Sequence, residues 1–121
     1  MNLFLVAIGG ALGSVSRFVL STLVLRTTGW LFPAGTFVVN VVGCLLFGAI
    51  VGAAEQRVVL SMEARAFLLS GVLGGFTTFS SYTFENFVLL RDGQWFTAAC
   101  NIIGQVVIGL AGFWAAYAFA R

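Results

Sequence analysis

Long apolar blocks, separated by short polar linkers, make up nearly the whole chain. The blocks cover residues 3–25, 33–54, 66–90 and 95–120. Each is long enough for a membrane-spanning helix, which needs about 20 residues. The linkers RTTGWLF, EQRVVLSMEAR and RDG are too short to hold a soluble domain. The pattern predicts an all-α membrane protein that forms a single domain over residues 1–121, with four transmembrane helices.

Polar residues within the blocks recur at helical spacing. Thr36 and Asn40 lie four residues apart in the second block. In the third block, Thr77, Ser81 and Glu85 follow the same spacing. Because residues three or four apart share a helix face, each span has one polar stripe. Such stripes serve either as hydrogen bonds between helices or as the lining of a path for a small polar solute. The stripes of the first and fourth blocks contain Ser14, Arg17, Ser21, Asn101 and Gln105.

Composition excludes most other classes of protein. The 121 residues are 60% hydrophobic and 8% charged, and they include no His and no Lys. Catalysis by a metal ion or an activated nucleophile has few residues to work with, so we expect no enzyme activity. We also expect no nucleic acid and no soluble protein as a partner. The polar groups inside the blocks are mainly neutral amides and hydroxyls, which together with aromatic ring edges favour a weakly held anion.

The positive charges give little preference for one orientation in the membrane. Arg57, Arg65 and Arg121 lie on one side of the expected topology. Arg26 and Arg91 lie on the other. Arginines in short loops tend to stay in the cytoplasm, and here the two sides nearly balance. We therefore expect the chain to insert in both orientations and to pair with itself as an antiparallel dual-topology homodimer.

The third block contains GVLGGFTTFSSYTFE at residues 71–85, which is a poor helix former. Its glycines cost backbone entropy, and the hydroxyls of Thr77 and Thr78 compete for backbone hydrogen bonds. We expect the third helix to break near its middle, between Gly74 and Thr77. A break at this depth frees carbonyl groups that protein, water or an ion must satisfy. Such carbonyls often coordinate a monovalent cation, and in a two-fold dimer they could hold one sodium ion.

Three motifs, in order along the chain, resemble the Fluc (CrcB) family of bacterial fluoride channels. They are GGALGSVSR in the first block, GTFVVN at the start of the second and GVLGGFTTFSSYTFE in the third. The resemblance covers the whole chain. It implies a multi-pass protein of the bacterial inner membrane that forms an antiparallel dual-topology homodimer. It also implies two fluoride pores and a structural sodium ion at the dimer interface.

The resemblance assigns roles to particular residues. The backbone carbonyls of Gly74 and Thr77 from both subunits would bind the sodium ion. The Asn40 amide would donate a hydrogen bond to fluoride. Phe79 and Tyr82 would present their ring edges to the ion, and the second of these positions is Phe in typical members of the family.

Other residues would line or flank the pore. Ser81 and Thr36 belong to the expected polar track. Arg17 matches an arginine in the family's first span, which would anchor the helix or attract anions at the vestibule. Glu85 would be a structural hydrogen-bond partner near a vestibule. Two serines are expected in the fourth span. Here they are replaced by Gln105 and Gly109, which alters the polar track.

The implied function is passive fluoride export. HF that enters from an acidic medium dissociates in the cytoplasm, and a fluoride-selective channel lets the negative-inside potential expel the anion. Two other functions stay open. A small dual-topology multidrug–proton exporter has a similar size, but it needs an acidic residue in its first span and residues 3–25 contain none. The other is a membrane assembly subunit without transport activity. The expected helix break argues against it, because hydrogen bonds that only hold helices together do not require an interrupted helix.

Overall fold

Three long helices form most of the molecule. The computed structural model describes residues 2–28, 32–56 and 59–121, so Arg57, which entered the charge balance above, lies outside the described residues. The long helices are each apolar enough to cross a membrane. Their bounds are Asn2–Thr28 for α1, Ala34–Gln56 for α2 and Trp95–Ala120 for α6. The bounds of α1 and α2 differ by a few residues from those of the first and second predicted spans, and α6 coincides with the fourth.

The predicted third span corresponds to a series of shorter elements. α3 (Met62–Arg65), the π-helix η1 (Ala66–Leu73) and α4 (Gly74–Phe76) follow one another without a gap. The Ser61 hydroxyl begins this series by accepting a hydrogen bond from the Ala64 N–H at 3.1 Å. After two non-helical residues the series continues as α5 (Phe79–Arg91).

The two non-helical residues are Thr77 and Thr78. Thr77 has φ −85° and ψ 156°, and Thr78 has φ −149° and ψ 122°, so both are extended. The sequence analysis expected the interruption to begin at Gly74, but this residue is helical, with φ −63° and ψ −35°. β-Branched side chains such as that of Thr favour extended backbone, which agrees with the observed position.

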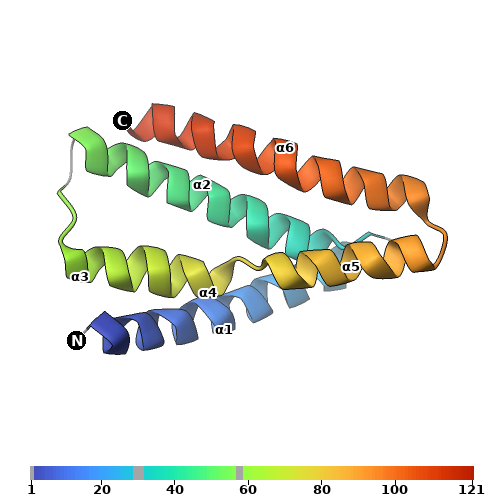
Figure 1. Ribbon diagram of the computed structural model, residues 1–121, viewed down its shortest axis with the longest axis horizontal. Coiled ribbons are helices and arrows are strands. Elements are labelled where there is room, and N and C mark those ends of the chain that lie inside the picture. The colour runs from blue at the N-terminus through green and yellow to red at the C-terminus, as the bar shows by residue number, and fades with distance from the viewer. Residues whose placement is uncertain (1, 29–31, 57–58) are drawn as a thin grey trace.

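The elements form four adjacent rows that alternate in direction along the chain. Figure 1 shows α2 beside α6, and the N- and C-termini at the same end of the molecule. α1 packs against η1 and α4, while α5 packs against α6. The alternation agrees with a chain that crosses a membrane repeatedly through short loops.

Glycines allow the rows to pack closely. A Cβ atom on Gly13 of α1 would overlap the carbonyl oxygen of Val72 and lie 2.9 Å from the Phe76 nitrogen. A Cβ atom on Gly48 of α2 would overlap the Phe113 carbonyl oxygen on α6. Small residues at such contacts are typical of helix packing in membranes.

The distribution of polar and apolar side chains is the reverse of that in a water-soluble bundle. Large apolar residues are exposed, including Leu3 at 86% and Phe119 at 91%. By contrast, Asn101 is fully buried, at 0% exposed. Lipid can cover the apolar exterior, whereas polar groups at this depth need partners within the protein. The candidate site is therefore to be sought among the inward-facing polar groups.

Candidate functional site

Asn40 holds the extended segment from the side of α2. Its Oδ1 accepts a hydrogen bond from the Thr78 N–H at 2.9 Å, and its Nδ2 donates to the Thr78 carbonyl oxygen at 3.1 Å. A side-chain amide can do this because it carries a donor and an acceptor at the same end. Asn40 thereby pairs both backbone groups of a residue that has left the helix.

Helical hydrogen bonds are exchanged for side-chain bonds at the interruption. In a continuous α-helix the Thr78 N–H would bond to the Gly74 carbonyl, and the Ser81 N–H to the Thr77 carbonyl. Here the first donor goes to Asn40, and the Ser81 N–H goes to the Thr78 Oγ1 at 3.3 Å. Thr78 is thus the N-cap of α5. The carbonyl groups of Gly74 and Thr77 lose their helical donors as a result.

Arg17 pairs another carbonyl group of the interrupted segment. Its Nε donates to the Gly75 oxygen at 3.1 Å, which ties α1 to the end of α4. In a continuous helix this oxygen would accept from the Phe79 N–H. The sequence analysis considered two roles for Arg17, anchoring of the helix and attraction of anions. This contact corresponds to anchoring.

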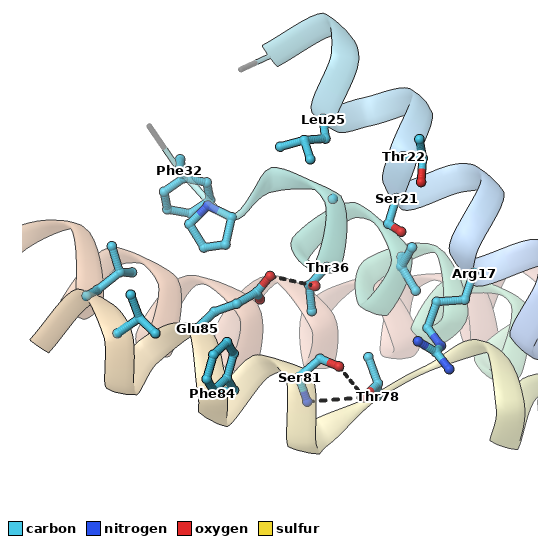
Figure 2. Close-up of a pocket in the computed structure, with 15 residues that line it drawn as sticks. Arg17, Ser21, Thr22, Leu25, Phe32, Thr36, Thr78, Ser81, Phe84 and Glu85 are labelled. Atoms are coloured by element: carbon cyan, nitrogen blue, oxygen red, sulfur yellow. Dashed lines mark hydrogen bonds between the residues drawn. The ribbon is translucent and has the colours of Figure 1, made fainter. Parts of the chain in front are cut away.

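A cavity of about 530 Å³ lies between α1, α2 and α5, and we call it the Glu85 cavity. Figure 2 shows the residues around it that were singled out from the sequence, namely Arg17, Ser21, Thr36, Ser81 and Glu85. The Thr36 hydroxyl donates to Glu85 Oε2 at 3.0 Å. The other carboxylate oxygen, Oε1, is buried and has no hydrogen-bond partner among the described residues. This cavity therefore combines hydroxyl groups with one acidic and one basic side chain.

A second cavity, of about 360 Å³, lies between α2, α5 and α6, and we call it the Asn40 cavity. The rings of Phe79 and Tyr82 lie 5.7 Å apart between centroids and are inclined by 40°. Phe79 is 78% exposed, whereas Tyr82 is buried. The Tyr82 hydroxyl donates to the Ile102 carbonyl oxygen at 2.8 Å, so the group that distinguishes it from Phe is bound to α6. The residues singled out from the sequence that line this cavity are Asn40, Thr77, Phe79, Tyr82 and Gln105.

Thr78 lines both cavities, and the sequence analysis did not select it as a site residue. Its hydroxyl accepts from the Ser81 N–H and donates to the Ser81 Oγ at 3.2 Å. The available signal was the N-cap preference, because Thr immediately before a helical run commonly caps it. Thr78 links the two cavities and fixes the start of α5.

Side-chain amides form a hydrogen-bonded chain beside the Asn40 cavity. Asn40 Nδ2 donates to Gln105 Oε1 at 2.8 Å, and Gln105 Nε2 donates to Asn101 Oδ1 at 2.9 Å. Asn101 Nδ2 in turn donates to Asn86 Oδ1 at 2.6 Å. The polar stripe of the fourth block included Gln105 and Asn101, but Asn86 was not selected from the sequence. The chain of amides joins α2, α6 and α5.

Gly109 also lies on the inner side of α6. It is buried, and a Cβ atom there would lie 3.2 Å from the Cys44 sulfur of α2. A side chain at this position would need the Cys44 thiol to move. The replacement of the expected serine by glycine therefore accompanies a close contact between α2 and α6.

The donors around the two cavities are mainly uncharged amides and hydroxyls. Among the described residues there is no group of three or more His, Cys, Asp or Glu side chains that could hold a metal ion. The fold and the site together define a class: a multi-pass helical membrane protein whose inward polar groups gather at an interruption between α4 and α5.

Sequence comparisons identify the family. Residues 4–117 match the family described as "CrcB-like protein, Camphor Resistance (CrcB)". A fluoride-specific ion channel FluC of Opitutus terrae is 50% identical over 117 residues, which cover 94% of this chain and 89% of that protein. The protein of the same name from Methylobacillus flagellatus is 44% identical over 121 residues, covering 99% of this chain and 94% of that one. The chain belongs to the CrcB family, as its motifs indicated, and it is a multi-pass bacterial membrane protein.

Proposed function

We propose that this chain is a fluoride-selective passive ion channel that exports cytoplasmic fluoride and so lowers its toxicity. The Asn40 cavity is the observation that carries the proposal, because an amide from α2 and two aromatic rings from α5 meet there. Relatives that match over nearly the whole chain are named as fluoride-specific channels. The name of these relatives describes a channel and not an enzyme.

Fluoride would exchange its water shell for fixed, uncharged donors. The amide N–H of Asn40 can donate to an anion, and the ring edges of Phe79 and Tyr82 carry partial positive charge. Thr36 and Ser81, which line the Glu85 cavity, would continue the polar track. Thr78 lies between the two sets because it lines both cavities. Arg17 and Glu85 would hold the surrounding helices in place.

The direction of transport would come from the membrane rather than from a coupling ion. Fluoride trapped in the cytoplasm is repelled by a negative interior, and moving one charge across 100 mV is worth about 2.3 kcal/mol. The protein would supply only a selective path. No step of this mechanism requires a carboxylate to change its protonation state.

The functional unit would be an antiparallel dual-topology homodimer in which residues 62–91 act as one interrupted third span. Phe79 and Gly74 support this proposal because both are exposed beside a segment with extended backbone. Non-helical backbone at membrane depth needs protein or water around it, and a second copy would supply the protein. Epitope tags on both termini test the topology. Each tag should be accessible from both membrane faces, and accessibility from a single face would contradict dual topology.

The dimer would also hold a structural sodium ion. Gly74 and Thr77 have carbonyl groups whose helical donors are taken by the Asn40 and Thr78 side chains. Carbonyl oxygens at unwound helix segments suit a monovalent cation, so the residues present fit the ion. Sodium would offset the partial negative charge of these carbonyls and join the two subunits.

Passive fluoride efflux from liposomes that contain the purified protein tests the proposed function. Fluoride release is followed with a fluoride electrode, and chloride release is measured under the same conditions. Rapid fluoride release with little chloride release supports the proposal. An absence of fluoride release would overturn it.

A further inference from the structure

Both hydrogens of the Asn40 amide nitrogen are engaged. One bonds to the Thr78 carbonyl oxygen at 3.1 Å, and the other to Gln105 Oε1 at 2.8 Å. A side-chain amide has two N–H donors. An anion in the Asn40 cavity therefore meets an Asn40 side chain with no free donor while Gln105 keeps its place.

Backbone groups fix which way the Asn40 amide faces. Its Oδ1 accepts from the Thr78 N–H and its Nδ2 donates to the Thr78 carbonyl. If the amide were rotated by half a turn, its Nδ2 would face the Thr78 N–H and its Oδ1 would face the Thr78 carbonyl oxygen, so neither pair could form a hydrogen bond. These groups are partly buried, and leaving a fully buried group unpaired costs about 1–3 kcal/mol. Asn40 consequently presents a donor, and not an acceptor, to Gln105.

Gln105 is held in the complementary orientation from its other end. Its Nε2 donates to Asn101 Oδ1 at 2.9 Å, and Asn101 passes the chain on to Asn86 at 2.6 Å. Gln105 is 8% exposed and Asn101 is fully buried, so water has little access to replace these bonds. The chain of amides therefore keeps the Gln105 oxygen on Asn40.

We propose that Gln105 is a positioning residue that controls how readily Asn40 donates to fluoride; this inference rests on the proposed function. Fluoride that reaches Asn40 displaces Gln105 Oε1 from one N–H, while Thr78 retains the other. Asn101 keeps Gln105 tethered nearby, so the bond re-forms after the ion leaves. A serine, which the resemblance leads one to expect at this position, is too short to act in the same way.

Replacing the Gln105 acceptor tests the inference. Gln105→Met keeps a long unbranched side chain but removes the oxygen that occupies Asn40. Fluoride efflux at low fluoride concentration should rise about fivefold, the equivalent of one net hydrogen bond of about 1 kcal/mol. Gln105→Ser provides a second variant with the same expectation. Melting temperatures in detergent establish that each variant is folded.

Asn101→Leu is the companion variant. It removes the oxygen that holds Gln105 Nε2, so it loosens Gln105 but keeps the Gln105 oxygen that bonds to Asn40. Its fluoride efflux should rise, though by less than in Gln105→Met, because the Gln105 oxygen can still return to Asn40. If the Gln105 variants and Asn101→Leu all reduce efflux to a similar degree, the amides are merely structural and the inference is wrong.

A second measurement does not depend on transport. Labelling asparagine side chains with ¹⁵N gives signals from four residues, Asn2, Asn40, Asn86 and Asn101. On titration with sodium fluoride, the Asn40 amide signals should shift more in Gln105→Met than in wild type. Equal shifts in the two proteins would contradict the inference.

The efflux experiment separates this inference from the proposed function. If the wild-type protein releases fluoride and the Gln105 variants show no increase, this inference alone is overturned. If the wild-type protein releases no fluoride, the proposed function itself is overturned.

Discussion

Asn40 on α2 bonds both the N–H and the carbonyl oxygen of Thr78, at 2.9 and 3.1 Å. This pairing lets the backbone stay extended between α4 and α5 without leaving either group of Thr78 unpaired. It also directs the Thr78 N–H away from Gly74, where a continuous helix would send it. Asn40 thus releases the Gly74 carbonyl group, whereas the Thr78 hydroxyl releases that of Thr77.

The Thr78 hydroxyl is expected to stabilise the start of α5. Thr78→Val removes the acceptor of the Ser81 N–H, and loss of an N-cap typically costs about 1 kcal/mol. The variant should therefore melt at a lower temperature in detergent. Thr78→Ser keeps the hydroxyl and should melt close to wild type. Destabilisation by Thr78→Ser, with Thr78→Val close to wild type, would show that the methyl group, and not the cap, matters.

An added methyl group at the contact between α1 and η1 should destabilise the protein. Gly13→Ala places a Cβ atom against the Val72 backbone, which cannot move independently of its helix. Overpacking of this kind costs about 1–3 kcal/mol. Gly10→Ala is the matched control, because its nearest contact would be at 4.0 Å. A similar loss of melting temperature in both variants would contradict the packing argument.

The order of elements and the polar stripes could be predicted from the sequence, because long apolar blocks and helical spacing are local properties. The exact position of the interruption could not. Gly75 was assigned to a helix break, yet a Cβ atom there would lie 2.6 Å from the Gly10 carbonyl oxygen of α1. The glycine is present for close packing within a helix, and the extended residues are the two threonines after it.

The sequence pattern also could not show which residues on different helices form hydrogen bonds with each other. Arg17 and Gly75 are 58 positions apart, and Asn40 and Gln105 are 65 apart. Spacing along one helix gives the face on which a residue lies, but it does not give the residue that it meets on another helix. Asn86 was overlooked for this reason, since only its burial and its bond with Asn101, both set by the fold, distinguish it from an ordinary exposed amide.

Sodium is expected to stabilise the proposed dimer. Exchange of sodium for N-methylglucamine should lower the melting temperature in detergent, and added sodium chloride should restore it in a concentration-dependent way, because a ligand that binds only the folded state stabilises it. Potassium chloride at equal ionic strength controls for screening of charges. A melting temperature that is the same in all three salts would contradict a structural sodium ion.

Phe79 should matter for transport and not for folding. Phe79→Ile removes the electropositive ring edge from a residue that is 78% exposed. We expect fluoride efflux to fall by about tenfold or more, which corresponds to about 1.4 kcal/mol, with little change in melting temperature. Phe96→Ile on α6 alters a ring that is 82% exposed and should leave efflux near wild type. Equal effects of the two substitutions would argue against a role for the Phe79 ring.

The most direct test of the whole account compares fluoride and chloride efflux from liposomes containing the wild-type protein. An outward gradient of the anion is imposed, and valinomycin with potassium removes the opposing voltage. The account predicts rapid fluoride release, chloride release close to that of protein-free liposomes, and a marked loss of fluoride release in Phe79→Ile. Fluoride release no faster than from protein-free liposomes, or chloride release at the fluoride rate, would contradict it.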